Sequence, residues 1–201
     1  MFLWILVVFL LTAILLRVRA ILPGRRRTPS FTSRHGPCKT CIVLGSGGHT
    51  MEMLRLVQTL GEQYQPRVYI VADALSAKAL QRQSEPNEVI PIARARHVGQ
   101  SWSSVPFTAA RALLDAIRVV WKIMPDLILC NGPGTCVPIC LAAYIPRFLG
   151  IRNIQIVYIE SFARIHALSL TGRLLYHFVD RLLVQWPDLQ DTKAEYHGVL
   201  V

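Results

Sequence analysis

A strand, a glycine-rich turn and a helix follow one another between residues 40 and 54, and this unit constrains the fold more than any other stretch. Thr40–Leu44 has the apolar composition of a buried strand, Gly45-Ser46-Gly47-Gly48-His49-Thr50 permits a tight turn, and helical spacing begins at Thr50. The N–H groups of such a loop and the positive end of its helix face one point. The sequence predicts an anion-binding loop there, with a purely structural turn as the alternative.

His49 stands where the loop enters the helix. A helix N-terminus disfavours an additional positive charge, so the neutral imidazole is favoured at this position. A neutral imidazole can accept a proton near neutral pH. We therefore take His49 as a candidate general base.

A nucleotide-binding function is the main alternative for the same loop. Thr50 occupies the third glycine position of the dinucleotide fingerprint G-x-G-x-x-G, so the match is partial. Asp73 follows the next apolar run, Val68–Ala72, where a ribose-binding acid would stand. No Gly-Lys-Ser/Thr follows the glycines, which excludes a P-loop. A self-contained, membrane-anchored Rossmann-type nucleotide-binding enzyme therefore stays open as a second hypothesis.

The first 22 residues predict a single transmembrane anchor. Residues 1–16 carry no charge, and if Arg17 and Arg19 snorkel the apolar span reaches Leu22, close to the roughly 20 residues that cross a bilayer. A cleaved signal peptide is the alternative, but no basic residue precedes the apolar run. The arginines that follow place the domain in the cytosol by the positive-inside rule, and residues 23–38 have the composition of a basic juxtamembrane linker.

The net charge and the spacing of the cysteines limit the classes of partner and metal that this chain is expected to bind. Twenty-two Lys and Arg residues against 12 Asp and Glu give a net charge of +10. Such a surface suits nucleic acid or anionic lipid, and the anchor favours the membrane over nucleic acid. Cys38 and Cys41 form a C-x-x-C, but Cys41 lies inside the first predicted strand and no second pair has zinc spacing. We predict no metal and no cofactor.

Strand-like and helix-like runs alternate from residue 39 to 201, which predicts a Rossmann-like α/β domain with a mostly parallel sheet. A long helix is expected between Ser103 and Pro125, with Phe107, Leu114 and Trp121 facing the sheet and its charged residues in solvent. Strands are predicted at residues 40–44, 68–72, 88–92, 126–130, 154–158 and 182–185, and the other helices at 50–60, 76–83, 136–149 and 168–179.

Two further strand ends carry unusual residues, and in parallel α/β sheets ligands bind at this edge. Asn131-Gly132-Pro133-Gly134-Thr135 lies between a strand and a helix that Thr135 can cap. Asn131 is expected to hydrogen-bond either a sugar or its own turn. Glu160 emerges at the end of another strand and either contacts a ligand or pairs with Arg164.

These motifs occur in an order and spacing that is familiar. The glycine loop, Asn131–Pro138, Val157–Ser161 and Gln185-Trp186-Pro187 closely resemble the membrane-anchoring subunit family of the UDP-N-acetylglucosamine transferase of asparagine-linked glycosylation. The similarity runs from about Lys39 to Val201. A more distant likeness is to the N-terminal half of the bacterial transferase that adds N-acetylglucosamine to the lipid-linked peptidoglycan precursor.

The resemblance implies the N-terminal half of a GT-B glycosyltransferase, anchored on the cytosolic face of the endoplasmic reticulum membrane. A separate soluble subunit would carry most of the UDP-N-acetylglucosamine site, and the pair would extend dolichyl-diphosphate-N-acetylglucosamine by a second sugar. His49 and Glu160 would be catalytic. The residues implied in binding the acceptor diphosphate or sugar are Gly45, Ser46, Gly47, Gly48, Thr50, Asn131, Gly134, Thr135, Arg94 and Arg96. Arg94 and Arg96 are open to a second interpretation as plain surface charge.

Three expectations complete the sequence account. The tail Gly198-Val199-Leu200-Val201 is apolar and should dock into the partner subunit or pack on its own sheet edge. The stretch from Asp73 to Glu88 is shorter than the family pattern. About 160 residues after the anchor suffice for one domain, whereas a GT-B site needs two, so we expect inactivity without the partner. A scaffold whose glycine loops are only turns is the third hypothesis.

Overall fold

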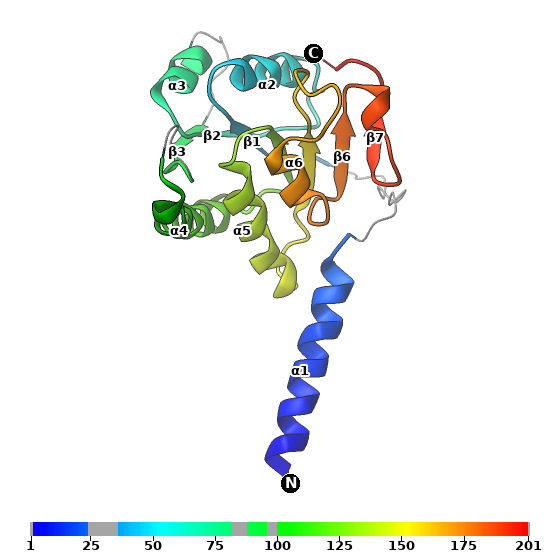
Figure 1. Ribbon diagram of the computed structural model, residues 1–201. Coiled ribbons are helices and arrows are strands. Elements are labelled where there is room, and N and C mark those ends of the chain that lie inside the picture. The colour runs from blue at the N-terminus through cyan, green and yellow to red at the C-terminus, as the bar shows by residue number, and fades with distance from the viewer. Residues whose placement is uncertain (1, 24–35, 82–87, 96–99, 201) are drawn as a thin grey trace.

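The computed structural model describes residues 2–23, 36–81, 88–95 and 100–200. They form an α/β domain around a seven-stranded sheet, from which one long N-terminal helix projects (Figure 1). The strand order is β3-β2-β1-β4-β5-β6-β7, and every neighbouring pair is parallel. The order reverses between β1 and β4, which makes their carboxyl ends the topological switch point of the sheet.

The strands are short and rich in branched apolar residues, as expected for a parallel sheet covered on both faces. The six expected strands are all present, although their bounds differ by one residue in places. A seventh, β7, was not predicted, because its three residues lack a recognisable apolar run. The strands are β1 (Thr40–Leu44), β2 (Arg67–Val71), β3 (Glu88–Pro91), β4 (Leu127–Asn131), β5 (Gln155–Ile159), β6 (Arg181–Val184) and β7 (Ala194–Tyr196).

The helices cover the two faces of the sheet unequally. Six α-helices are described, together with the short 3-10 turns η1 (Trp102–Ser104) and η2 (Pro187–Leu189). The helix α6 is shorter than the predicted 168–179, because it begins two residues later and the chain after Leu175 continues as turns. The helices are α1 (Phe2–Ile21), α2 (Gly48–Gln58), α3 (Ala74–Gln81), α4 (Val105–Ile123), α5 (Cys136–Phe148) and α6 (Leu170–Leu175).

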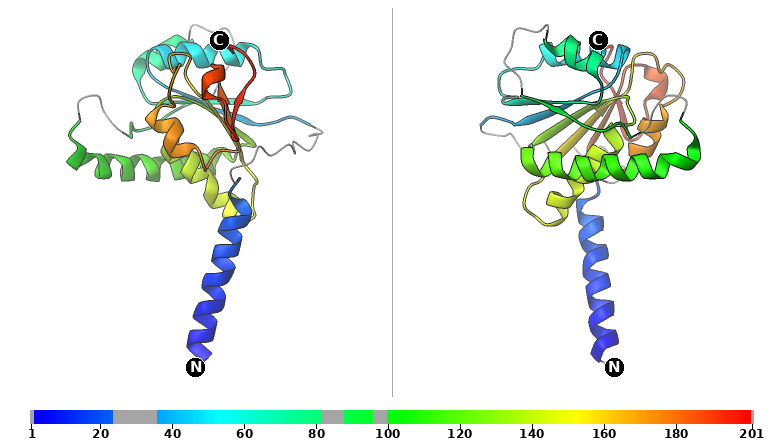
Figure 2. Two further views of the ribbon diagram at one scale, coloured as in Figure 1. Left: turned by 45° about the vertical axis from the view of Figure 1, so that its right-hand side comes forward. Right: turned by 90° about the vertical axis from the view of Figure 1, so that its left-hand side faces the viewer.

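Alternating side chains of each strand feed two separate cores. On β1, Ile42 and Leu44 pack with Met53 and Val57 of α2, and Leu80 of α3 joins the same cluster. The other residues of β1 face a larger core that α4, α5 and α6 close, and Figures 1 and 2 show these two sets of helices on opposite sides of the sheet. Residues two apart in a strand share a face, so this division follows directly from the strand pattern.

The orientation of α4 contradicts our prediction. Phe107, Leu114 and Trp121, expected in the core, are 80%, 57% and 47% exposed. The sheet is covered instead by a stripe of smaller residues on the opposite side of the helix, Ala112, Ala116, Val120 and Ile123. Alanines allow the helix to lie close to the strands, so the bulkiest apolar residues point outward. The charged residues Arg111, Asp115 and Arg118 do lie outside the core, as predicted.

The helix α1 is long and apolar enough to cross a membrane, and none of its residues is buried against the domain. At about 1.5 Å per residue its 20 residues span about 30 Å, the thickness of a bilayer core. Its last turns are held to the domain because Arg17 donates to the carbonyls of Arg147 and Phe148 at the end of α5. The helix leaves the domain at the end where α4 lies crosswise to it (Figure 2).

Candidate active site

The glycine loop lies at the carboxyl end of β1 and runs directly into α2. Gly47 has a φ of 60°, a conformation that favours glycine, and Thr50 N–H closes the first turn onto its carbonyl at 3.1 Å. Ser46, Gly47 and Gly48 are exposed, and a Cβ atom added at Gly47 or Gly48 would meet nothing within 4 Å. The start of α2 is therefore open to solvent, and the first-turn N–H groups of a helix have no intrahelical partner, as an anion-binding loop requires.

A chain of hydrogen bonds joins α2 to the ends of β4 and β5. His49 Nδ1 lies 3.0 Å from Oδ1 of Asn131, and Asn131 Nδ2 donates to Oε2 of Glu52 at 3.0 Å. The other carboxylate oxygen of Glu52 accepts from the Ser161 hydroxyl at 2.9 Å. Asn131 is fully buried, and its side-chain oxygen and amide group contact His49 and Glu52 rather than its own turn. It fixes the histidine.

This chain determines which ring nitrogen carries the proton. A carboxylate only accepts hydrogen bonds, so the amide NH₂ of Asn131 faces Glu52 and its oxygen faces the ring. Nδ1 of His49 must then be the N–H donor, which leaves Nε2 of a neutral ring with a free lone pair. The ring is half-buried beside the glycine loop. His49 is thus oriented as a proton acceptor, by a partner that is held in turn by Glu52.

Two glycines make room for the histidine. Gly132 has a φ of 74°, and a Cβ atom there would overlap the Nδ1, Cε1 and Nε2 atoms of the His49 ring. A Cβ at Gly45 would lie 2.8 Å from the His49 Cβ and 3.0 Å from Cγ of Pro133. These two positions are therefore closed to any larger residue while His49 keeps its place.

The second glycine turn leads into α5 at the end of β4, next to the first loop in the sheet. Gly134 lies at the start of α5, and a Cβ there would meet nothing within 4 Å. Thr135 is the residue before the first turn, but its side chain makes no capping hydrogen bond, contrary to our prediction. Because β1 and β4 are adjacent, the N-termini of α2 and α5 lie at the same edge of the sheet. Both favour negative charge there.

Glu160 occupies a different environment from the one we expected. Its side chain is fully buried, and its carboxylate accepts from the backbone N–H of Ser161 at 3.1 Å and from the N–H and hydroxyl of Ser169 at 2.9 and 3.0 Å. Within the described residues it forms no ion pair with Arg164. Burial, and then the nearby Glu160 carboxylate, raise the pKa of the Tyr158 hydroxyl. Glu160 thus fixes the loop before α6.

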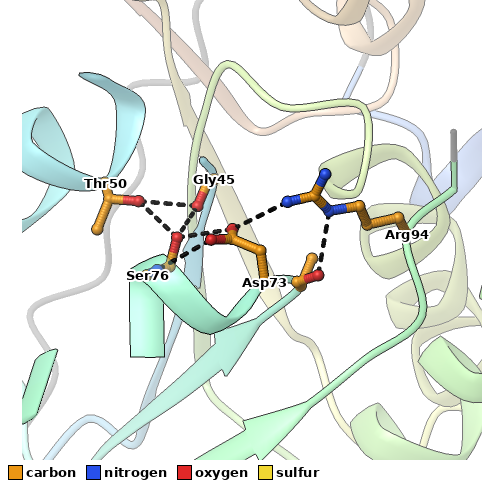
Figure 3. A network of polar contacts seen from close by, with 6 residues as sticks. Gly45, Thr50, Asp73, Ser76 and Arg94 are labelled. Atoms are coloured by element: carbon orange, nitrogen blue, oxygen red, sulfur yellow. Dashed lines mark hydrogen bonds and ion pairs between the residues drawn. The ribbon is translucent and has the colours of Figure 1, made fainter. Parts of the chain in front are cut away.

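The glycine loop is also tied to the loop after β2 (Figure 3). The Thr50 hydroxyl donates to the carbonyl of Gly45 at 2.8 Å and lies 2.8 Å from the Ser76 hydroxyl, whose oxygen also contacts that carbonyl. The carboxylate of Asp73 accepts from the Ser76 N–H and hydroxyl at 2.9 and 2.7 Å, and Arg94 pairs with it at 3.6 Å. Burial alone would raise the pKa of Asp73, but the hydrogen bonds from Ser76 and the charge of Arg94 outweigh it and lower the pKa. Asp73, the candidate ribose ligand, is engaged within the protein.

Arg94 lies at a cavity on this edge of the domain. It donates to the Ala72 carbonyl at 3.2 Å and lines a pocket of about 510 Å³, which Thr108 and Arg111 of α4 close on the other side. Its side chain is about one-third exposed. Arg96 lies outside the described residues.

The C-terminal tail packs in part on its own domain. The N–H of Leu200 donates to Oε1 of Gln185 at 3.2 Å, and Leu200 contacts the core beneath α2. Gln185 also donates to the carbonyl of Glu160 at 3.0 Å. Val199 is 54% exposed, and Val201 lies outside the described residues. Leu200 therefore packs on its own domain, but against the core cluster beside α2 rather than on an edge strand, and Val199 lies at the surface.

Sequence reasoning missed two residues that organise the site. Glu52 lies three residues after His49, a spacing that places both on one face of a helix. Ser76 opens no recognisable motif, yet it joins Gly45 to Asp73. The spacing of His49 and Glu52 could have indicated the first of these. The second depends on a contact between segments 31 residues apart in the chain.

The parallel sheet, its switch point and the glycine turns at adjacent strand ends define one half of a GT-B glycosyltransferase fold. Two solved structures share it at low sequence identity. MurG of Acinetobacter baumannii matches 80% of this chain with a TM-score of 0.61 and 19% identity. The calicheamicin glycosyltransferase CalG4 matches 81% with a TM-score of 0.51 and 14% identity. The chain spans 45% and 53% of those two proteins.

The chain belongs to the family of Alg14-like oligosaccharide biosynthesis proteins, whose family model matches residues 40–200. The UDP-N-acetylglucosamine transferase subunit of Schizosaccharomyces pombe is 44% identical over 201 aligned residues, covering 94% of this chain and 95% of its own. The subunit of the same name from Mus musculus is 44% identical over 190 residues, covering 86% and 88%. The chain is therefore a UDP-N-acetylglucosamine transferase subunit by family, with one apolar N-terminal helix that could span a membrane.

Proposed function

We propose that this chain is the membrane-anchoring, acceptor-binding half of a two-subunit transferase that moves N-acetylglucosamine from UDP-N-acetylglucosamine to dolichyl-diphosphate-N-acetylglucosamine. The observation that carries the proposal is the His49 ring, oriented by Asn131 beside two glycine turns that lead into helices and have open space at Gly47, Gly48 and Gly134. In this proposal the His49 ring accepts a proton, and the helix N-termini bind a diphosphate. These are the two functions that an acceptor site for a lipid diphosphosugar needs.

The proposed step is an inverting sugar transfer. The acceptor hydroxyl attacks C1 of the donor sugar, its proton passes to Nε2 of His49, and the bond from C1 to the UDP oxygen breaks. The N–H groups at Gly47 and Gly48 hold the acceptor diphosphate so that the hydroxyl faces the ring. Glu52 and Asn131 keep the ring in the required tautomer. We assign Glu160 a positioning role, because its buried carboxylate organises the loop that carries Ser161.

The membrane lies along the outer face of α4 in this proposal. This helix runs about 28 Å, from the carboxyl-end edge of the sheet at Val105 back to the edge where α1 leaves. Its exposed stripe of Phe107, Leu114 and Trp121, flanked by Arg111 and Arg118, has the pattern of a helix lying in a lipid interface. A lipid acceptor would then reach the glycine loop past the first turns of α4 and the pocket beside Arg94.

The remaining half of the site belongs, in this proposal, to a soluble partner that binds UDP-N-acetylglucosamine and is recruited to the cytosolic face of the endoplasmic reticulum. The word "subunit" in the names of the relatives and the match to about half of larger glycosyltransferases support a split enzyme. The exposed Val199, beside the anchored Leu200, is the part of the tail that we assign to the interface. Alone, the chain is expected to be inactive.

The test is sugar transfer measured in membranes that carry this chain, with and without the soluble candidate partner. Radiolabelled UDP-N-acetylglucosamine is the donor, and a short-chain dolichyl-diphosphate-N-acetylglucosamine is the acceptor. Transfer only with both chains supports the proposal. Transfer by this chain alone would refute the split site. If the partner is shown to be bound and the two chains together transfer no sugar, the assigned reaction is refuted.

A further inference from the structure

A second cavity, of about 550 Å³, lies where the anchor helix meets the domain, at the opposite edge of the sheet from the glycine loop. Its walls come from the last turns of α1, the end of α5 and the amino ends of β5 and β6. Four arginines and one aspartate supply its charged side chains: Arg17, Arg147, Arg152, Arg181 and Asp180. The proposed transfer reaction uses none of these residues.

Arg147 is a buried polar residue in the wall of the cavity, and its side chain is held by several contacts. The residue is 95% buried, since its relative exposure is 5%, and its guanidinium pairs with Asp180 at 2.5 Å and donates to the carbonyl of Ile154. A third contact reaches the carbonyl of Ile21, in the last turn of α1, at 3.5 Å. Its Nε atom is buried without a hydrogen-bond acceptor among the described residues. Buried donors are nearly always satisfied, so the described residues leave one N–H of this guanidinium without its usual partner.

Among the described residues, three of the four arginines that line the cavity pair with a carboxylate, and the fourth does not. Arg147 pairs with Asp180, Arg152 with Asp126 and Arg181 with Glu195. Arg17 is different, because its contacts are two backbone carbonyls at the end of α5, and it forms no ion pair within the described residues. Its guanidinium lines the cavity with a positive charge that no carboxylate among the described residues neutralises, so an anion is favoured there.

The position of the cavity relative to the membrane indicates which anion it binds. Arg17 lies in the last turns of a 20-residue apolar helix, at the level where a spanning segment meets the phosphates of the cytosolic leaflet. We propose that the cavity binds the phosphate of an anionic lipid headgroup, which bridges Arg17 of the anchor to the buried Arg147 of the domain. Arginine suits this role because its planar group donates to two phosphate oxygens at once. The bound lipid would fix the domain on its anchor.

The inference rests on α1 being a membrane anchor and on no other part of the proposed function. The experiment uses the full chain in nanodiscs of phosphatidylcholine with and without phosphatidylinositol, and native mass spectrometry counts the retained lipid. The wild-type chain is expected to retain phosphatidylinositol in preference to phosphatidylcholine. Arg17→Gln should reduce that retention about fivefold or more, whereas Arg19→Gln, which removes the same charge from the same turn outside the cavity, should change it less than about twofold.

A second pair of variants keeps the test decisive if Arg17→Gln loosens the anchor. Asn153 is exposed at the cavity wall, so Asn153→Glu adds a repelling carboxylate and Asn153→Gln is its neutral control. Loss of phosphatidylinositol with Asn153→Glu alone supports the inference. Equal effects of Arg17→Gln and Arg19→Gln, full displacement of the lipid by inorganic phosphate, or no lipid preference in a correctly inserted chain would each overturn it. Alkaline extraction from membranes tests insertion separately.

Discussion

Glu52 accepts a hydrogen bond from the Ser161 hydroxyl at 2.9 Å, although 109 residues separate the two in the chain. This contact fastens α2 to the end of β5, while the other oxygen of Glu52 holds Asn131 and, through it, the His49 ring. The catalytic geometry that we propose therefore depends on how α2 is positioned relative to the ends of two strands, β4 and β5.

Two substitutions at Glu52 should show whether sugar transfer depends on the hydrogen bonds of this side chain or on its negative charge. Glu52→Ala leaves the Asn131 amide without its acceptor, and we expect kcat to fall about 10- to 100-fold in the assembled complex. Glu52→Gln can still accept from Asn131 and donate to Ser161, whose hydroxyl both donates and accepts, so it should stay within about threefold of wild type. Steady-state kinetics with saturating partner measure both. A Gln variant as impaired as the Ala variant would show that the charge itself is required.

The two glycines of the second turn provide a matched pair. Gly132→Ala would place a methyl group in the His49 ring and force an alanine to φ 74°, so we expect large loss of activity and destabilisation by about 1–3 kcal/mol. Gly134→Ala adds the same methyl group in open space and should have little effect on the free energy of unfolding. Chemical denaturation and transfer assays check both values. Equal tolerance at the two positions would contradict the packing of His49 on Gly132.

The outer face of α4 predicts a spectroscopic signal. Because Trp121 is 47% exposed and lies opposite the core stripe of α4, lipids brominated near the headgroup should quench its fluorescence in full-length protein in vesicles. In a background carrying Trp4→Phe and Trp102→Phe, which removes the tryptophans of the anchor and of η1, Trp121→Phe should remove most of the quenching and change stability by less than about 0.5 kcal/mol. Trp186, packed on Phe162 at a ring distance of 5.0 Å, should contribute little. Quenching that survives Trp121→Phe would place α4 away from the bilayer.

Asp73 predicts a pH dependence of stability. Its pKa is lowered in the folded protein, because the hydrogen bonds from Ser76 and the charge of Arg94 outweigh the effect of burial. A lowered folded-state pKa stabilises the protein above the ordinary carboxyl pKa of about 3.9, and this stabilisation is lost as the pH falls through the folded-state value. The Asp73→Asn variant should therefore have a lower free energy of unfolding than wild type at neutral pH. Below about pH 5 its free energy of unfolding should fall less steeply with pH than that of wild type. Urea unfolding in detergent across that range measures it, and an unchanged decline would contradict the network in Figure 3.

The sequence predicted the sheet and the glycine turns at adjacent strand ends, because both depend on short-range patterns. Apolar runs marked six strands, and the glycines beside His49 and Asn131 marked adjacent strand ends. The burial of Glu160 and the role of Glu52 could not be predicted, since each depends on partners far away in the chain. For α4 the pattern was ambiguous: the helix carries two apolar stripes, and only packing against the sheet showed that the one with smaller residues is inside.

The central claim is that Nε2 of His49, oriented by Asn131, takes the proton of the acceptor hydroxyl. The most direct measurement is single-turnover transfer by the assembled complex carrying His49→Gln, with partner binding measured in the same preparation. We predict a rate reduced at least about 100-fold, with unchanged partner binding. A His49→Gln complex that transfers sugar at the wild-type rate would contradict the claim.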